Sequence, residues 1–200
     1  MAIDRAAAAN AIETFLRAIG RDPATEPDLV GTGARVADAY VDELCAGYIV
    51  DTRALLASSA IAIATTGVGE GGGLVIVRDV AITTMCPHHL LPASGTATIA
   101  MQTRKQMVGL GTLASLLEAH ARRLTLQERI GEAVVADITE VLEPEWVACR
   151  LVLVHMCMVA RGERSVGSRV ETLAVRAASN DAAARTHAVH SANIALGCGR

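Results

Sequence analysis

The sequence predicts an α+β fold in which a mainly antiparallel sheet follows an N-terminal helical segment. Apolar residues recur first at helical spacing and then in the order strand–strand–helix–helix–strand–strand, with hairpin-like pairs at both ends. Of the 200 residues, 52% are hydrophobic and 20% are charged, so the chain can bury a packed core. Only 2% are aromatic, and aliphatic side chains and alanine must therefore fill that core.

The first segment, residues 1–66, is expected to be helical. Apolar residues at helical spacing predict one helix over residues 5–19, and the proline-containing run 22–27 ends it. A second helix is expected over residues 34–46, where an apolar stripe lies opposite acidic residues. The glycine-rich run at 67–73 then marks the expected boundary with the main domain.

The main domain, residues 67–178, carries the predicted sheet. The expected elements are strands over 74–83 and 95–102, helices over 113–124 and 126–142, a long strand over 147–159 and a last strand over 169–176. The long strand is expected to place His155 and Cys157 on one face, because side chains alternate along a strand. Residues 179–200 are expected to form a C-terminal tail, and residues 180–200 are small and polar enough to fray.

Charge and composition exclude several classes of protein. A net charge of −3 and a pI near 6.1 argue against a protein that binds nucleic acid over its whole surface. No run has the length and apolarity of a membrane span, and the N-terminus lacks the layout of a signal peptide, so a cytoplasmic location without membrane association is expected.

The five cysteines form no dense framework in a chain of this length. In a reducing compartment such cysteines indicate metal ligands or buried thiols. Cys45 and Cys149 are expected in the core, and Cys198 in the mobile tail.

The run CPHH at residues 86–89 and the run HMC at 155–157 are the most informative motifs. Thiolate and imidazole are the ligands that zinc prefers, and Cys86, His89 and Cys157 form a plausible set of three. A structural zinc site normally closes with a fourth Cys or His, whereas three protein ligands with one position left to water are typical of a catalytic zinc.

Two more histidines, His88 and His155, lie beside the proposed ligands, where proton-transfer groups would be needed. The alternative is two unrelated buried thiols and some core histidines. Each residue taken singly favours that alternative, and their occurrence together favours the metal site. His120, outside both motifs, is expected on a helix surface.

Several motifs resemble those of the GTP cyclohydrolase I family. They occur in the family's order and at its spacing, between about Thr32 and Leu173. The motifs are TGARVA at 32–37, VRD at 77–79, MCPHH at 85–89, VGL at 108–110, RRLTLQER at 122–129 and HMCMVARG at 155–162.

The resemblance implies the tunnelling fold, in which paired antiparallel strands carry two helices on one side. It also implies a homo-oligomer, a decamer of stacked rings with active sites at subunit interfaces. In such a site Cys86, His89 and Cys157 hold zinc, while His155 is expected as the acid that protonates the purine and His88 as the second proton carrier.

The substrate implied by the resemblance is a small-molecule purine. The implied reaction opens the imidazole ring of GTP at C8, releases formate and gives 7,8-dihydroneopterin triphosphate. Gln127 and Glu128 match the pair that holds the guanine edge. Arg161 and Arg35 match further substrate-binding residues, with Arg35 expected to reach a neighbouring subunit's site. Thr125 and Glu128 also fit a helix capping box, which is the local alternative for this segment.

One stretch departs from the family pattern. After VGL the family usually reads Ser-Lys, with an Arg three residues beyond the Lys, whereas this chain has Gly111, Thr112 and Ser115. In the family these positions contact the ribose-triphosphate end of the substrate.

Two other functions therefore stand beside the GTP reaction. One is a diverged relative that hydrolyses a purine base, nucleoside or less phosphorylated nucleotide. The other is a non-catalytic zinc-containing protein of the same fold. The complete set of three zinc ligands speaks against a nitrile reductase of this fold.

Overall fold

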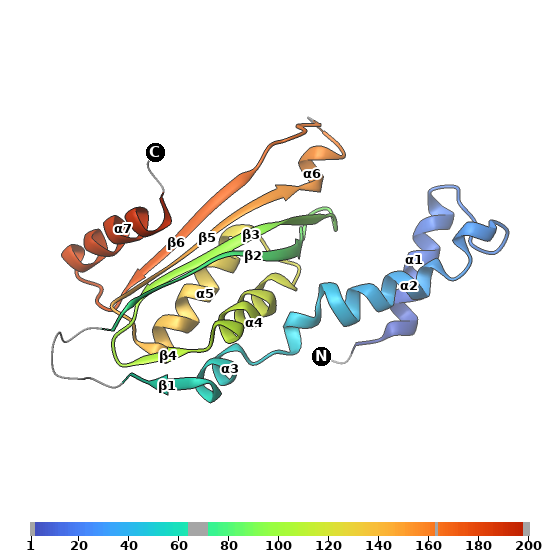
Figure 1. Cartoon of the computed structure of the whole chain (residues 1–200). Helices are drawn as coiled ribbons and strands as arrows, with labels where there is room; N and C mark the ends of the chain where they lie inside the picture. Colours follow the sequence, from blue (N-terminus) through green and yellow to red (C-terminus); the bar gives the residue numbers. More distant parts are fainter. Residues whose placement is uncertain (1–2, 64–71, 163, 198–200) are drawn as a thin grey trace. The chain divides into compact units, whose positions relative to one another are not determined.

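The computed structural model in Figure 1 describes residues 3–63, 72–162 and 164–197. The chain divides into two compact units, Met1–Ala46 and Gly47–Arg200. The predicted boundary at residues 66 and 67, and most of the glycine-rich run after it, lie outside the described residues. The predicted division into 1–66, 67–178 and 179–200 therefore stays a prediction.

The first unit is helical, as expected. Its elements are α1 (Arg5–Ala18), η1 (Pro27–Leu29), α2 (Thr32–Asp38) and the π-helical η2 (Ala39–Leu44). The Asp4 carboxylate caps α1 by accepting a hydrogen bond from the Ala7 amide. Gly33 lets α2 approach α1 closely, because a Cβ there would lie 2.5 Å from the Ala9 carbonyl oxygen.

The second unit is built on a four-stranded antiparallel sheet with the order β2-β3-β5-β6. The strands are β2 (Leu74–Met85), β3 (Pro92–Gln102), β5 (Trp146–His155) and β6 (Val170–Ala177). A separate pair joins β1 (Ala60–Ala62) to β4 (Gln106–Val108), and two short helical elements, η3 (Ala46–Ile49) and α3 (Thr52–Ser58), lead into it.

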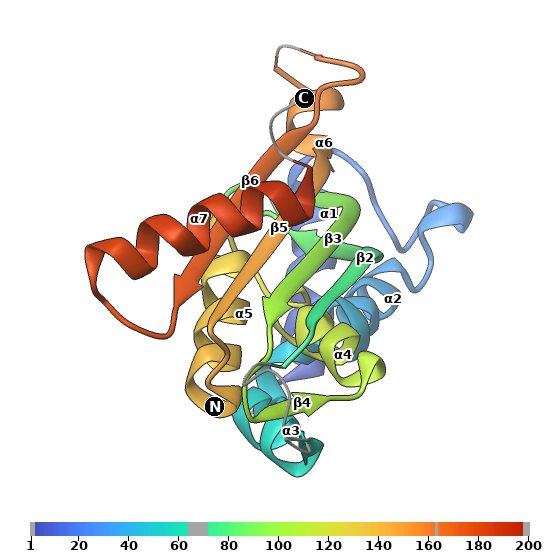
Figure 2. The same ribbon diagram turned by 60° about the vertical axis from the view of Figure 1, so that its left-hand side comes forward.

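Helices cover both faces of this sheet (Figures 1 and 2). On one face, α4 (Leu110–Ala121) and α5 (Gln127–Leu142) bury the main core, which receives Cys149 and Leu151 from β5. The alternate residues Trp146 and Ala148 face the opposite side. The predicted α+β fold with two helices on one side of an antiparallel sheet is confirmed.

The opposite face is covered by α7 (Ala182–Leu196), where the sequence predicted a frayed tail. The Asp181 carboxylate caps this helix by accepting from the amides of Ala183 and Ala184. Small residues such as Ala188 and Ala192 allow the helix to pack closely on the sheet. The expectation for residues 182–196 was therefore wrong, while Cys198 lies outside the described residues.

The long predicted strand also ends earlier than expected. β5 stops at His155, and residues Met156–Val159 form the short helix α6. Cys157 consequently lies on a helical turn, and it does not share a strand face with His155.

Two predictions about core residues had opposite outcomes. Cys149 is fully buried as expected, and burial raises the pKa of its thiol to about 12. His120 was expected on the surface but is only 7% exposed. Its Nε2 lies 2.8 Å from an Asp137 carboxylate oxygen, which offers the buried ring a hydrogen-bond partner. No helix in the described ranges has the length and apolarity needed to cross a membrane.

Candidate active site and metal centre

A tight turn between β2 and β3 presents the first two predicted metal ligands. The Cys86 amide donates to the Leu91 carbonyl at 3.0 Å, and the Leu90 amide donates to the Cys86 carbonyl at 2.9 Å. Leu90 adopts a left-handed backbone conformation with φ of 52°, which closes the turn. This local geometry holds Cys86 and His89 on one short loop.

The third predicted ligand comes from α6. Donor atoms of Cys86, His89 and Cys157 all lie within 4.8 Å of one another, and Cys86 Sγ is 3.7 Å from His89 Nδ1. Cys86 is buried, Cys157 is half-buried and His89 is exposed, so the cluster is open on one side. Two sulfurs and one imidazole nitrogen at this spacing fit a zinc ion.

Without metal, the Cys157 thiol holds its proton more firmly than an ordinary cysteine. Burial raises the pKa of Cys157 above its usual value, and the neighbouring Cys86 thiol raises it further. Arg161, two residues after α6, places Nη1 2.7 Å from His89 Nε2. A guanidinium can only donate, so the Nε2 atom of His89 accepts in this arrangement.

The start of α5 is tied to the same loop. Met85 forms a β-bridge with Leu124, and the Thr125 amide donates to the Met85 carbonyl at 3.2 Å. Helix α5 begins at Gln127 with no side-chain cap, so the capping box expected as an alternative is not formed. Glu128 in the first turn is exposed.

Gln127 is buried and faces the protein interior. Its Nε2 lies 3.2 Å from the Leu151 carbonyl, 3.0 Å from the Val170 carbonyl and 3.1 Å from Thr172 Oγ1. Its Oε1 lies 2.8 Å from His155 Nε2. Burial lowers the pKa of His155 below its usual value, while the negative charge of Glu128 acts in the opposite direction.

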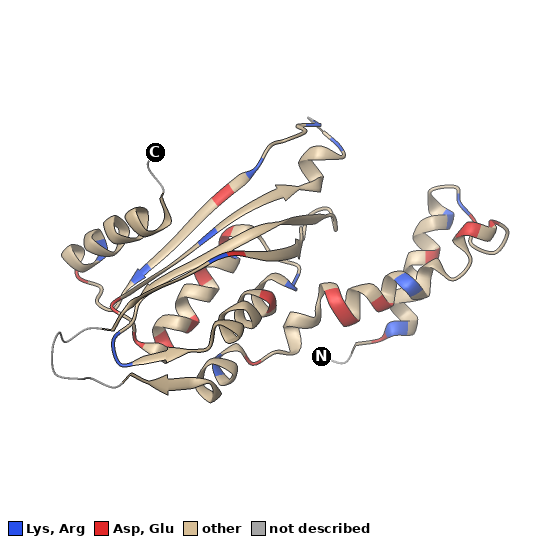
Figure 3. Cartoon of the chain, viewed as in Figure 1, with Lys and Arg blue, Asp and Glu red and all other residues tan. Residues whose placement is uncertain are grey.

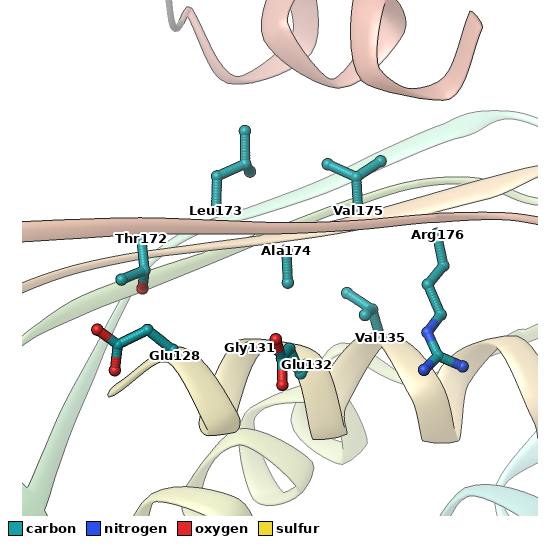
Figure 4. A pocket seen from close by; sticks show the side chains of 9 residues that line it. All are labelled: Glu128, Gly131, Glu132, Val135, Thr172, Leu173, Ala174, Val175 and Arg176. Atoms are coloured by element: carbon teal, nitrogen blue, oxygen red, sulfur yellow. The ribbon is translucent and has the colours of Figure 1, made fainter. Parts of the chain in front are cut away.

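A cavity of about 700 Å³ lies between α5 and β6. Figure 4 shows Glu128 and Thr172 at one end of it and Arg176 at the other. None of the three residues of the metal cluster lines this cavity, although Glu128 directly follows Gln127, which contacts His155. Sequence reasoning missed Thr172, because a single threonine in a strand carries no signal of a neighbour 45 residues away.

The remaining predicted site residues belong to different elements. His88 is exposed, and its ring centroid is 6.2 Å from that of His89, in an edge-to-face arrangement. Arg35 belongs to the first unit, where it donates to the Val30 carbonyl and the Thr32 hydroxyl. Gly111 and Thr112 lie in the first turn of α4, and this first turn carries no charged side chain.

Comparison with known proteins gives one consistent result. The family model described as GTP cyclohydrolase I matches residues 8–193. The protein named GTP cyclohydrolase 1 from Synechococcus sp. is 40% identical over 79% of this chain and 66% of its own length. The protein of that name from Geobacillus kaustophilus is 40% identical over 83% of this chain and 84% of its own length. The protein of that name from Leptospira biflexa is 36% identical over 82% of this chain and 85% of its own length.

Proposed function

The chain belongs to the GTP cyclohydrolase I family, and we propose that it converts GTP into 7,8-dihydroneopterin triphosphate and formate. In this reaction one water adds at C8 of the guanine and opens the imidazole ring, a second water cleaves the remaining C–N bond to C8, and the carbon leaves as formate. The ribose then rearranges and closes the second ring with loss of one water. The chain is thus a hydrolase that acts on a cyclic amidine C–N bond.

One observation carries the proposal. Cys86, His89 and Cys157 gather three donor atoms within 4.8 Å. Two residues before Cys157, His155 contacts Gln127, and Glu128 follows at the start of α5. A site built only to bind a structural metal would need neither His155 nor Glu128.

We propose zinc as the metal of this cluster, held by both thiolates and by the His89 imidazole. Bound there, zinc would supply Lewis-acid activation of water near neutral pH. The half-open cluster leaves room for one more ligand beside the three protein groups.

His155 is the proposed proton donor to N7 of the purine, because protonation at N7 makes C8 more electrophilic. Imidazole suits this task, since it exchanges protons close to neutral pH. The exposed His88, next to His89 in sequence, is the proposed second proton carrier.

Glu128 is the proposed partner of the guanine edge. A carboxylate accepts hydrogen bonds from both N1–H and the exocyclic amine of guanine, and adenine cannot supply that pair. Glu128 is exposed and lines the cavity along β6, so its oxygens are available to a ligand. The predicted guanine contact of Gln127 rests on the family resemblance alone, because its side-chain amide is already hydrogen-bonded inside the protein.

The triphosphate is proposed to lie along the basic segment between α6 and β6. Arg161, Arg164 and Arg169 all fall there in the sequence, and Figure 3 shows basic residues, in blue, between these two elements. Arginine suits phosphate because its planar fork donates two parallel hydrogen bonds. Arg35 is proposed to add a further contact from a neighbouring subunit.

A second candidate function is favoured by the uncharged first turn of α4. Gly111, Thr112 and Ser115 stand where the family usually supplies two cations and a hydroxyl to the substrate's phosphate end. A chain without those contacts would bind a purine base, nucleoside or less phosphorylated nucleotide with little loss of affinity relative to a chain that has them. A non-catalytic zinc protein is the third possibility.

We further propose a homo-oligomer, a decamer, in the cytoplasm. The sheet ends in two edge strands, β2 and β6, and the cavity that holds Glu128 lies along one of them. An unpaired edge is a ready site for pairing with another chain.

Formate release tests the function directly. Purified zinc-loaded protein is offered guanine, guanosine, GMP and GTP in parallel, with ATP as the control for base recognition. We expect formate in proportion to lost purine absorbance, fastest with GTP and absent with ATP. Release from guanosine at an equal rate would favour the diverged relative, and no release from any purine would favour the non-catalytic protein.

A further inference from the structure

We propose that Gln127 is a positioning residue that fixes the tautomer and orientation of His155, and that it does not read the guanine. This inference rests on the proposed function, because it assigns Gln127 a part in the same reaction. It starts from the buried amide at the first residue of α5, whose two polar atoms both have partners inside the protein.

The orientation of the Gln127 amide is set by what surrounds it. Two backbone carbonyls, those of Leu151 and Val170, and the Thr172 hydroxyl lie 3.0–3.2 Å from one end of the amide. Carbonyl oxygens only accept hydrogen bonds, so that end must be the NH2 group. The reversed orientation would direct the amide oxygen at two other oxygens in a buried place, at the cost of unmade hydrogen bonds.

The amide oxygen therefore points at His155. Its distance from His155 Nε2 is 2.8 Å, and an amide oxygen can only accept. Nε2 must then carry a hydrogen, both in the neutral ring and in the charged one. The lone pair of the neutral ring is left on Nδ1, which has no hydrogen-bond partner among the residues that the structure describes.

This arrangement gives the two ring nitrogens different tasks. Nε2–H anchors the ring to α5, and Nδ1 is the atom that takes up a proton and passes it to the purine. The second partner of a catalytic imidazole commonly fixes which nitrogen reacts. Here a neutral amide takes the place that a carboxylate often has, so the anchor adds no charge to the ring's surroundings.

The anchor also connects His155 to the cavity. Thr172 lines the cavity together with Glu128, and its hydroxyl is one of the three groups that orient the Gln127 amide. Gln127, which sets the proton-carrying atom of His155, is thus adjacent to Glu128, which is proposed to hold guanine. This adjacency keeps the His155 ring and the guanine in a fixed relation to one another.

The tautomer can be measured without turnover. In the zinc-loaded protein labelled with ¹⁵N-histidine, solid-state NMR distinguishes protonated from unprotonated ring nitrogens. The six histidines are separated by assigning His155 as the signal lost in a His155→Asn variant. We expect the neutral ring of His155 to carry its hydrogen on Nε2 in the wild type, and a hydrogen on Nδ1 instead would overturn the proposal.

Two variants test whether Gln127 is what fixes the tautomer of His155. Gln127→Met has nearly the same shape but no acceptor, so we expect a mixture of His155 tautomers. Thr172→Val removes one of three groups that orient the amide, and we expect the Nε2–H tautomer to persist because two carbonyls remain. Zinc content and thermal unfolding of each variant show whether it is folded; if Gln127→Met does not fold, the wild-type and Thr172→Val spectra still decide the assignment.

Kinetics separate positioning from substrate contact. For Gln127→Met we expect kcat to fall by about 10²-fold or more, in the range of general acid catalysis, with the affinity for a non-reacting guanine nucleotide unchanged. A loss of affinity with kcat and the tautomer unchanged would show that Gln127 contacts guanine and would overturn the proposal. If wild type releases no formate from any purine, the proposed function fails, while the spectra still report on the anchor.

Discussion

Cys86, His89 and Cys157 illustrate how single residues acquire their places for local reasons. The left-handed Leu90 closes the turn that holds the first two, and the helical turn that follows β5 carries the third. The loop that carries Cys86 and His89 is tied to the start of α5 through the bridge between Met85 and Leu124. The proposed metal ligands, proton carriers and base-recognition residue therefore meet at one end of the sheet.

Removal of one thiol tests the metal set. In a Cys157→Ala variant only one thiolate and one imidazole remain, so we expect bound zinc after dialysis to fall from about one per chain to a small fraction of that. Cys45→Ala, which alters a half-buried thiol in the other unit, is the matched control and should keep its zinc. Elemental analysis decides, and full zinc content in the Cys157 variant would remove this residue from the set.

Arg161→Ala separates the two leading substrates. If the triphosphate binds at Arg161, loss of one charge-assisted contact of about 1.5–3 kcal/mol should lower kcat/KM for GTP about 10–100-fold. The same change should barely affect guanosine, which carries no phosphate. Steady-state kinetics on both substrates make the comparison, with Arg185→Ala on α7 as the control cation.

Because Arg161 also contacts His89, zinc content must be measured in the Arg161→Ala variant. Equal losses on GTP and guanosine at full zinc content would contradict a phosphate contact. A silent Arg161→Ala combined with an inactive Glu128→Ala would instead point to a base or nucleoside as the substrate.

At the scale of elements, a buried polar cluster joins three helices and shares no residue with the metal cluster. Asp137 of α5 accepts from the Thr52 hydroxyl of α3 at 2.6 Å, and its other oxygen lies 3.3 Å from Arg53 Nε. His120 of α4 completes the cluster. Burial lowers the pKa of His120 below its usual value, against the opposing effect of Asp137, so the folded protein favours the neutral ring.

This cluster predicts a loss of stability in mild acid. The pKa of His120 is lower when folded, so the unfolded chain binds more protons once the pH falls below its ordinary value of 6.5. The free energy of unfolding should therefore decrease from that pH downwards, until the folded pKa is reached. Burial raises the pKa of Asp137, but its hydrogen bonds outweigh burial and lower that pKa overall. Protonation of Asp137 therefore adds a further loss of stability at lower pH.

A His120→Gln variant isolates the histidine. Glutamine can still donate to Asp137 but does not titrate. The urea midpoint of unfolding of the variant should therefore decline less than that of wild type as the pH falls below 6.5. Midpoints measured at several pH values, with zinc content held constant, make the comparison. Parallel pH profiles for the two proteins would show that His120 does not contribute.

At the scale of the whole molecule, we propose that assembly completes the site. Arg35 lies in the first unit and the metal cluster in the second, and the sheet has unpaired edges at β2 and β6. An interface that brings Arg35 of one subunit to the metal cluster of another would join these parts.

Complementation tests that shared site. Arg35→Ala and Cys157→Ala chains should each be nearly inactive alone, because each spoils every site in its own oligomer. After mixed refolding, random assembly should restore about one quarter of wild-type activity. In that share of sites the Arg35→Ala chain supplies an intact Cys157 and the neighbouring Cys157→Ala chain supplies an intact Arg35. No recovery in mixed oligomers, or a fully active monomer in sedimentation, would argue against a site shared between subunits.

The sequence by itself determined much of this protein. The α+β class and five of the six predicted main-domain elements, to within a few residues, follow from apolar periodicity. The grouping of Cys86, His89 and Cys157 follows from the metal-binding residue types of two motifs that are distant in the sequence. The uncharged stretch at Gly111 and Thr112 is also a property of the sequence alone. These features are local, or depend on motifs whose residue types suit few kinds of site besides a metal centre.

Only the tertiary structure decided the rest. A strand was predicted through Cys157, but the apolar run that predicted it continues into α6, and short-range pattern cannot separate the two. Residues 182–196 look frayed in isolation because their apolar face is mostly alanine, which becomes stabilising only against Trp146 and the sheet. His120 is buried because Asp137 of another helix accepts its hydrogen bond, and Gln127 faces His155 because Leu151 and Val170 present their carbonyls to it. Partners distant in sequence carry no short-range signal, so the direction in which a polar side chain points is settled only when the chain is folded.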